Sequence, residues 1–130
     1  MTDNLIMVVD DSQTVRTSVE YTLSKEGFKV VGAEDGEQGL RLLEELRQQM
    51  KRPAMIITDV NMPRMDGISM LREIKKNVWT RFIPVLILTT ESQEHKKQEG
   101  KNAGAAGWLV KPFKPEQLVY VVKKFVKTDS

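Results

Sequence analysis

The chain has 130 residues, no cysteine and a formal net charge of +2. These values predict one domain, exclude disulfides, zinc–thiolate sites and a cysteine nucleophile, and give no charge-based reason to expect a nucleic-acid partner. The first residues lack a basic region and no apolar run is long enough to cross a bilayer, so we expect a cytoplasmic protein without a signal peptide or membrane span.

Apolar runs and helical patterns alternate five times along the chain. The run 5–9 is continuously apolar, which is typical of a strand buried on both faces, and Ser12 is a natural N-cap for the helix that follows. The predicted strands cover 5–9, 28–33, 55–59, 84–88 and 106–110, and the predicted helices cover 13–26, 37–50, a segment after Gly67, 92–103 and a segment opened by Pro115. This alternation predicts an α/β domain with a parallel sheet covered on both faces.

The segment 92–103 differs from the other predicted helices because it is almost wholly polar and contains Gly100. With few apolar anchors, it is expected to be a helix of low local stability, which suits a moving signalling element. An ordinary exposed helix would show the same composition, so the two interpretations stay open.

Most of the predicted strands end on a polar residue that could do chemistry. Asp10 and Asp11 follow the first strand, Asp59 ends the third, Thr89 follows the fourth and Lys111 follows the fifth. Because the carboxyl ends of parallel strands share one rim, these side chains should converge there. Taken singly, each has an ordinary structural explanation as a helix cap, turn residue, strand former or solvated lysine.

Three carboxylates at one rim repel one another unless a cation lies among them. A few oxygen ligands with room for water and phosphate suit Mg²⁺ or Mn²⁺. A metal, the Lys111 ammonium and the Thr89 hydroxyl would together surround the oxygens of a phosphoryl group in transfer. The pattern therefore predicts that Asp59 is a nucleophile that forms an aspartyl-phosphate, with Asp10 and Asp11 holding the metal.

Four motifs in this order resemble the receiver domains of two-component response regulators, and most closely the single-domain chemotaxis receivers of the CheY type. They are Val8-Val9-Asp10-Asp11-Ser12, Thr58-Asp59-Val60-Asn61-Met62-Pro63-Arg64-Met65-Asp66-Gly67, Leu88-Thr89-Thr90 and Val110-Lys111-Pro112-Phe113. The resemblance covers essentially the whole chain. It implies a flavodoxin-like, doubly wound sheet of five parallel strands in the order 2-1-3-4-5 with five flanking helices.

The resemblance also implies a role for each site residue. Asp59 would be the phosphoacceptor, and Thr89 and Lys111 would be the switch hydroxyl and its paired ammonium. Further implied features are Mg²⁺ ligation by Asp10, Asp11, Asp59 and the backbone carbonyl of Asn61, tuning of hydrolysis by Asn61 and Glu91, and a cis bond between Lys111 and Pro112. The aromatic switch position, usually tyrosine or phenylalanine, is Trp108 here, and this indole is either a switch or simply part of the core.

The function implied is a stand-alone response regulator, spanning residues 1–130 as a single receiver domain without an output domain. A histidine kinase would phosphorylate Asp59, and the change would alter binding to another protein, such as a flagellar motor switch protein in chemotaxis. A phosphorelay carrier or phosphate sink that serves a histidine phosphotransfer protein is the first alternative, and a Mg²⁺-dependent phosphohydrolase is the second. We expect a monomeric phosphoacceptor rather than an enzyme, with no DNA or membrane partner and with a phosphatase as a further candidate partner.

Overall fold

Five parallel strands form the sheet of the computed structural model, which describes residues 4–90 and 94–126. The strands are β1 (Leu5–Val9), β2 (Lys29–Ala33), β3 (Met55–Asp59), β4 (Val85–Thr90) and β5 (Gly107–Lys111). Their order in the sheet is β2-β1-β3-β4-β5, and every neighbouring pair is parallel. The predicted strand order and parallel arrangement are therefore confirmed.

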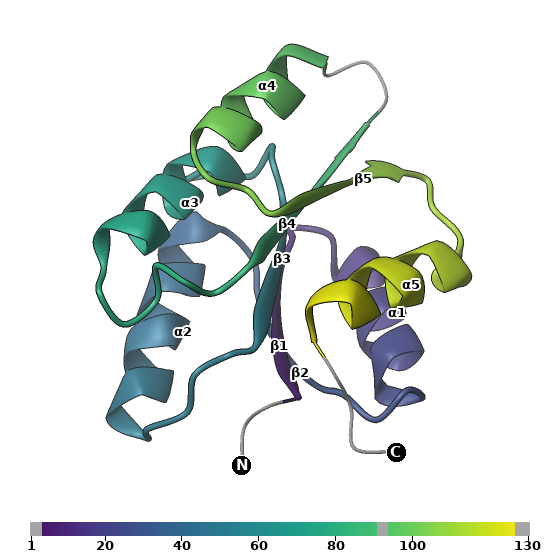
Figure 1. Ribbon diagram of the computed structural model, residues 1–130, viewed down its shortest axis with the longest axis horizontal. Coiled ribbons are helices and arrows are strands. Elements are labelled where there is room, and N and C mark those ends of the chain that lie inside the picture. The colour runs from purple at the N-terminus through teal and green to yellow at the C-terminus, as the bar shows by residue number, and fades with distance from the viewer. Residues whose placement is uncertain (1–3, 91–93, 127–130) are drawn as a thin grey trace.

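Helices cover both faces of this sheet (Figure 1). They are α1 (Gln13–Ser24), α2 (Gly36–Gln48), α3 (Gly67–Lys76), α4 (Glu94–Asn102) and α5 (Pro115–Phe125). Helices α1 and α5 lie on one face, and α2, α3 and α4 lie on the other. No helix in the described residues is long and apolar enough to cross a membrane.

The core consists of two apolar layers, one on each face of the sheet. Side chains alternate between faces along a strand, so Ile6 and Val8 of β1 join the layer under α1 and α5, whereas Met7 and Val9 join the layer under α2 and α3. All four are fully buried. The central strands are therefore continuously apolar, and their polar residues occur only where the strands end.

Side-chain caps fix the starts of the three helices that follow β1, β2 and β3. Val15 N–H donates to Ser12 Oγ at 3.2 Å, Gln38 N–H donates to Asp35 Oδ1 at 2.9 Å, and Ser69 N–H donates to Asp66 Oδ1 at 2.7 Å. Each cap satisfies an amide that the helix itself leaves without a partner. The caps hold the loops at the carboxyl end of the sheet in defined conformations.

The predicted boundaries differ from the observed ones by one or two residues at several ends. Strand β4 was expected to end at residue 88, but it continues to Thr90 because Thr89 pairs with Val110 and Thr90 with Lys111 of β5. Helix α1 ends at Ser24 instead of residue 26, and Gly27 has the left-handed backbone conformation (φ 92°) expected of its terminator.

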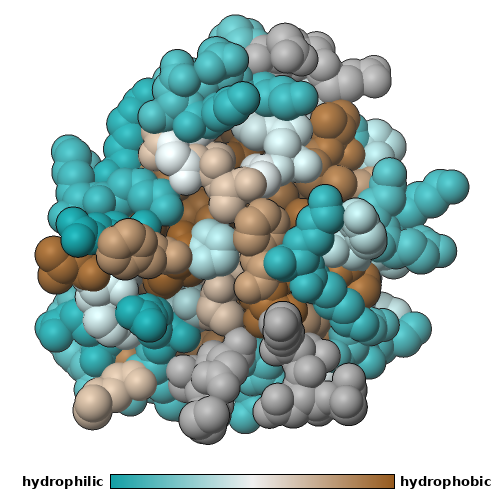
Figure 2. Space-filling view, viewed as in Figure 1, coloured by the Kyte–Doolittle hydropathy of each residue, from teal (hydrophilic) through white to brown (hydrophobic). Residues whose placement is uncertain are grey.

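Helix α4 is the most polar of the helices, as the sequence predicted. Among its residues 95–102 only Gly100 is buried, and Figure 2 shows an almost wholly hydrophilic surface over this helix. An ion pair of 3.2 Å between Arg72 of α3 and Glu99 of α4 connects it to its neighbour. The half-buried Trp108 packs against the apolar layer on this face.

Candidate functional site

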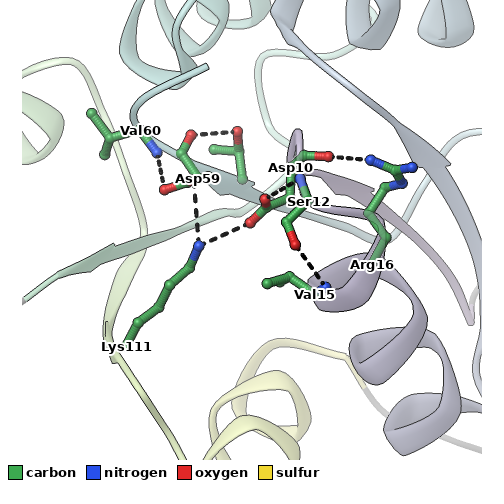
Figure 3. Close-up of polar contacts among 8 residues, drawn as sticks. Asp10, Ser12, Val15, Arg16, Asp59, Val60 and Lys111 are labelled. Atoms are coloured by element: carbon green, nitrogen blue, oxygen red, sulfur yellow. Dashed lines mark hydrogen bonds and ion pairs between the residues drawn. The ribbon is translucent and has the colours of Figure 1, made fainter. Parts of the chain in front are cut away.

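Four strands bring the predicted site residues to one rim of the sheet. Asp10 directly follows β1, Asp59 is the last residue of β3, and Lys111 is the last residue of β5. In the sheet register Asp59 lies opposite Leu88, which places Thr89 one residue further along β4. Figure 3 shows the Lys111 side chain reaching from β5 toward both Asp10 and Asp59.

The Lys111 ammonium lies between two carboxylates. Its Nζ atom is 3.0 Å from Asp10 Oδ2 and 3.3 Å from Asp59 Oδ2 (Figure 3). The other oxygen of each acid accepts a backbone hydrogen bond, from Ser12 N–H to Asp10 Oδ1 at 2.9 Å and from Val60 N–H to Asp59 Oδ1 at 2.8 Å. Both carboxylates are therefore held by one charged and one neutral donor.

A third carboxylate completes an acidic cluster. One ligand oxygen each from Asp10, Asp11 and Asp59 lie within 4.8 Å of one another. Asp10 is buried, Asp59 is partly buried and Asp11 is exposed, so the cluster opens to solvent on one side. Three hard oxygen donors with an open side suit a small divalent cation that keeps several waters, as Mg²⁺ does, and Mn²⁺ accepts the same ligands.

The charges in this cluster do not balance without a cation. Burial raises the pKa of Asp59, the positive charge of Lys111 opposes that rise and the negative charge of Asp10 adds to it. Burial alone would lower the pKa of Lys111, but the hydrogen bond to Asp10 and the charges of Asp59 and Asp10 raise it overall. Three carboxylates thus face one ammonium, and a bound metal ion would offset the excess negative charge.

Two supporting contacts were not predicted from the sequence. Arg16 Nη1, in the first part of α1, donates to the backbone carbonyl of Asp10 at 2.5 Å, and Thr58 Oγ1 donates to the carbonyl of Asp59 at 2.9 Å. Both fix the backbone of an acidic residue instead of its side chain. Thr58 precedes Asp59 directly, but this adjacency does not indicate which atom it contacts, and Arg16 is six positions away from Asp10.

Gly67 is a further residue whose importance the sequence did not show. It begins α3, and a Cβ atom added there would lie only 2.0 Å from the carbonyl oxygen of Asp59. Its own N–H donates to the Val60 carbonyl at 2.9 Å. Helix α3 therefore starts against the backbone of the candidate nucleophile, and only glycine permits this approach.

The remaining predicted residues take different positions. Thr89 is buried, the Lys111–Pro112 bond is cis as expected, and Asn61 lies exposed in the loop between β3 and α3. Glu91 lies outside the described residues. Trp108 packs beside α4, where a Cβ on Gly100 would lie 3.1 Å from indole Cζ3, so the indole is part of a packed layer and its role as a switch stays a prediction.

Known proteins share this arrangement along nearly the whole chain. The response regulator receiver domain family matches residues 6–123. Protein PilH of Pseudomonas aeruginosa is 35% identical over 117 residues, which are 90% of this chain and 93% of PilH. The chain spans about half the length of several curated transcriptional regulators that it also matches.

Solved structures show the same fold. The chemotaxis response regulator CheY4 of Vibrio cholerae is 41% identical, with a TM-score of 0.82 over 94% of this chain and 98% of CheY4. The receiver domain of the sensor histidine kinase PA1611 from Pseudomonas aeruginosa, with a magnesium ion coordinated in its active-site cleft, is 28% identical, with a TM-score of 0.84 over 96% of this chain and 98% of that one. From the family match over residues 6–123 and these similarities, we conclude that the chain belongs to the response regulator receiver domain family.

Proposed function

We propose that this receiver domain is a switch controlled by Mg²⁺-dependent phosphorylation of Asp59 by a histidine kinase. The observation that carries the proposal is the convergence of three carboxylates with the Lys111 ammonium, 3.3 Å from Asp59. Asp10, Asp11 and Asp59, with the backbone carbonyl of Asn61, would hold the metal. When bound, Mg²⁺ would supply positive charge to the oxygens of the phosphoryl group.

The protein's own groups would divide the work of phosphoryl transfer. A carboxylate oxygen of Asp59 forms a bond to phosphorus as the bond from phosphorus to the donor's imidazole nitrogen breaks, and that nitrogen keeps the electron pair. Lys111 stabilises the charge on the transferred group. Val60 N–H and Lys111 orient the Asp59 carboxylate before the reaction, so little reorganisation is needed.

The phosphoryl group would then change the surface beyond β4. Its charge would draw the buried Thr89 toward Asp59 and shift the segment from Thr89 to Trp108, which includes the weakly anchored α4. Such a ligand typically biases a pre-existing equilibrium by about 1–3 kcal/mol. The surface formed by α4, β5 and α5 would then bind a partner protein, and the similarity to CheY4 supports a flagellar motor switch protein in chemotaxis.

A phosphorelay carrier or phosphate sink would use the same site differently. In that case the phosphoryl group would pass from Asp59 to a histidine phosphotransfer protein, and α4 would need no output partner. A Mg²⁺-dependent phosphohydrolase is the alternative from another class. It would use Asp59 as a nucleophile but would need a second acid to turn over an external substrate.

Turnover experiments separate these functions. The purified protein is incubated with Mg²⁺ and a small phosphodonor, and phosphate release and protein phosphorylation are followed together. The proposal predicts phosphorylation of the protein and no multiple turnover of unrelated phosphate esters. Fast multiple turnover of such esters would favour the phosphohydrolase instead.

Partner capture decides between the outputs. Phosphorylated and unphosphorylated protein are compared for binding to a motor switch peptide and to a histidine phosphotransfer domain. The switch proposal predicts tighter binding of the motor peptide by the phosphorylated form. Transfer of the phosphoryl group to the phosphotransfer domain, with no change in peptide binding, would favour the relay.

A further inference from the structure

A second ion pair lies next to the acidic cluster, and the phosphorylation chemistry does not use it. Arg64 Nε and Nη2 lie 2.7 and 2.5 Å from Asp35 Oδ2. Asp35 is fully buried, and its other oxygen accepts the N–H of Gln38 at 2.9 Å as the N-cap of α2. Arg64 belongs to the loop between β3 and α3, so the pair connects that loop to the start of α2.

Arg64 has a backbone conformation that is unusual for an arginine, and its side-chain contact with Asp35 explains why an arginine occupies this position. Its φ angle is 65°, in the left-handed region that favours glycine or asparagine. A residue other than glycine keeps this conformation only when the surrounding structure stabilises it. The forked guanidinium, which reaches a buried carboxylate with two nitrogens, provides that contact, and neither glycine nor asparagine could span the same distance.

Two close backbone contacts fix the same loop near its end. Gly36 N–H donates to the Met65 carbonyl at 3.0 Å, and a Cβ on Gly36 would lie 2.7 Å from Met65 Cγ. Gly67 packs against the Asp59 carbonyl. The loop therefore leaves Asp59, passes Asn61 and returns against α2 and β3, and Arg64 anchors its middle.

We infer that Asp35 and Arg64 are positioning residues that hold the loop in the conformation in which the Asn61 carbonyl serves the Mg²⁺ site. This inference rests on the proposed function, because it concerns the metal of the same site. Neither residue touches the acidic cluster, and both act through the loop backbone. Partners outside the ligand shell typically change metal affinity by about 10–100-fold when they are removed.

The test is Mg²⁺ binding to the unphosphorylated protein, measured by isothermal titration calorimetry. Arg64→Asn removes the ion pair but suits the left-handed backbone, and Asp35→Asn removes the charge but keeps a good N-cap. We expect each variant to bind Mg²⁺ about tenfold more weakly than the wild-type protein. The double variant should be no weaker than either single one, because the two residues act as one unit.

A matched control removes an ion pair elsewhere. Arg47 pairs with Glu44 at 2.6 Å on the exposed surface of α2, so Arg47→Ala should leave Mg²⁺ affinity unchanged. Arg64→Lys, which keeps the charge but not the fork, should bind Mg²⁺ with an affinity between those of Arg64→Asn and the wild-type protein. Urea unfolding of each variant measures any loss of global stability separately.

The outcomes distinguish this inference from the proposal beneath it. A wild-type protein that binds no Mg²⁺ overturns the proposed function and this inference with it. If the wild-type protein binds Mg²⁺ and both single variants bind it equally well, the inference alone is wrong. Additive losses in the double variant would also contradict it, since they would show that the two residues act independently.

Discussion

Alanine in place of Gly67 should disturb phosphorylation of Asp59 through the backbone. Gly67 begins α3 directly against β3, and the added Cβ would lie 2.0 Å from the Asp59 carbonyl oxygen and 3.0 Å from Thr58 Oγ1. The first of these contacts is with main-chain atoms, so no side-chain rotation can relieve it. Either the end of β3 or the start of α3 must move.

The size of the movement follows from the contact. Real Cβ atoms almost never approach another heavy atom closer than 3.0 Å, so Asp59 or α3 must shift by about 1 Å, and a misplacement of about 1 Å can slow a reaction about 100-fold. Overpacking of this kind typically destabilises a fold by about 1–3 kcal/mol. A domain with ordinary stability of about 5–15 kcal/mol would still fold.

The assay compares rates of phosphorylation by a small phosphodonor at saturating Mg²⁺, with urea unfolding as a measure of stability. Gly27→Ala is the control: Gly27 has a left-handed φ of 92°, which strains an alanine, but a Cβ there meets nothing within 4 Å, so this variant should lose stability without losing rate. We expect Gly67→Ala to react about 100-fold more slowly than Gly27→Ala. Equal rates in the two variants would refute the claim that this contact positions Asp59.

The electrostatics and packing around the site lead to three more predictions. Lys111→Ala leaves the carboxylates of Asp10 and Asp59 without their shared ammonium, so the free energy of unfolding without metal should fall by about 1–3 kcal/mol. An unchanged free energy in urea unfolding would contradict the claim that Lys111 offsets these two charges. Asp59→Asn should gain stability relative to the wild-type protein as pH rises above 3.8. Burial, with the charge of Asp10, raises the pKa of the Asp59 carboxyl in the folded protein, so the folded state binds that proton more tightly than the unfolded chain. Thermal unfolding of both proteins across acidic and neutral pH measures the stability difference, and a difference that shrinks with rising pH would have the wrong sign. Trp108→Ala should lower the free energy of unfolding by about 2–4 kcal/mol, because the half-buried indole packs beside Gly100. Trp108→Phe should lower it by less than about 1.5 kcal/mol. Equal losses of the two variants in urea unfolding would show that the volume of the aromatic side chain does not matter.

The fold and the principal site residues were predictable because they depend on local pattern. A buried parallel strand must be apolar along its length, so the polar residue after it marks its end. The sequence alone therefore predicts that Asp10 and Asp59 lie at the rim of the sheet. The cis bond at Pro112 and the Asn61 carbonyl as a metal ligand follow only from the family resemblance, and the cis bond is confirmed.

The supporting contacts were not predictable because they join residues that only the tertiary structure brings together. Arg64 and Asp35 are 29 positions apart, and nothing near either residue indicates the other. The approach of Gly67 to Asp59 depends on how closely α3 starts against β3. The extra length of β4 likewise depends on pairing with β5.

Intact-mass measurement after incubation with Mg²⁺ and a small phosphodonor tests the central claim most directly. The wild-type protein should gain the mass of one phosphoryl group, and it should gain none when the Mg²⁺ is removed by a chelator. Asp59→Asn, which keeps the shape of the side chain but lacks the nucleophile, should gain none under either condition. Phosphorylation of Asp59→Asn to the same extent as the wild-type protein would contradict the claim that Asp59 accepts the phosphoryl group.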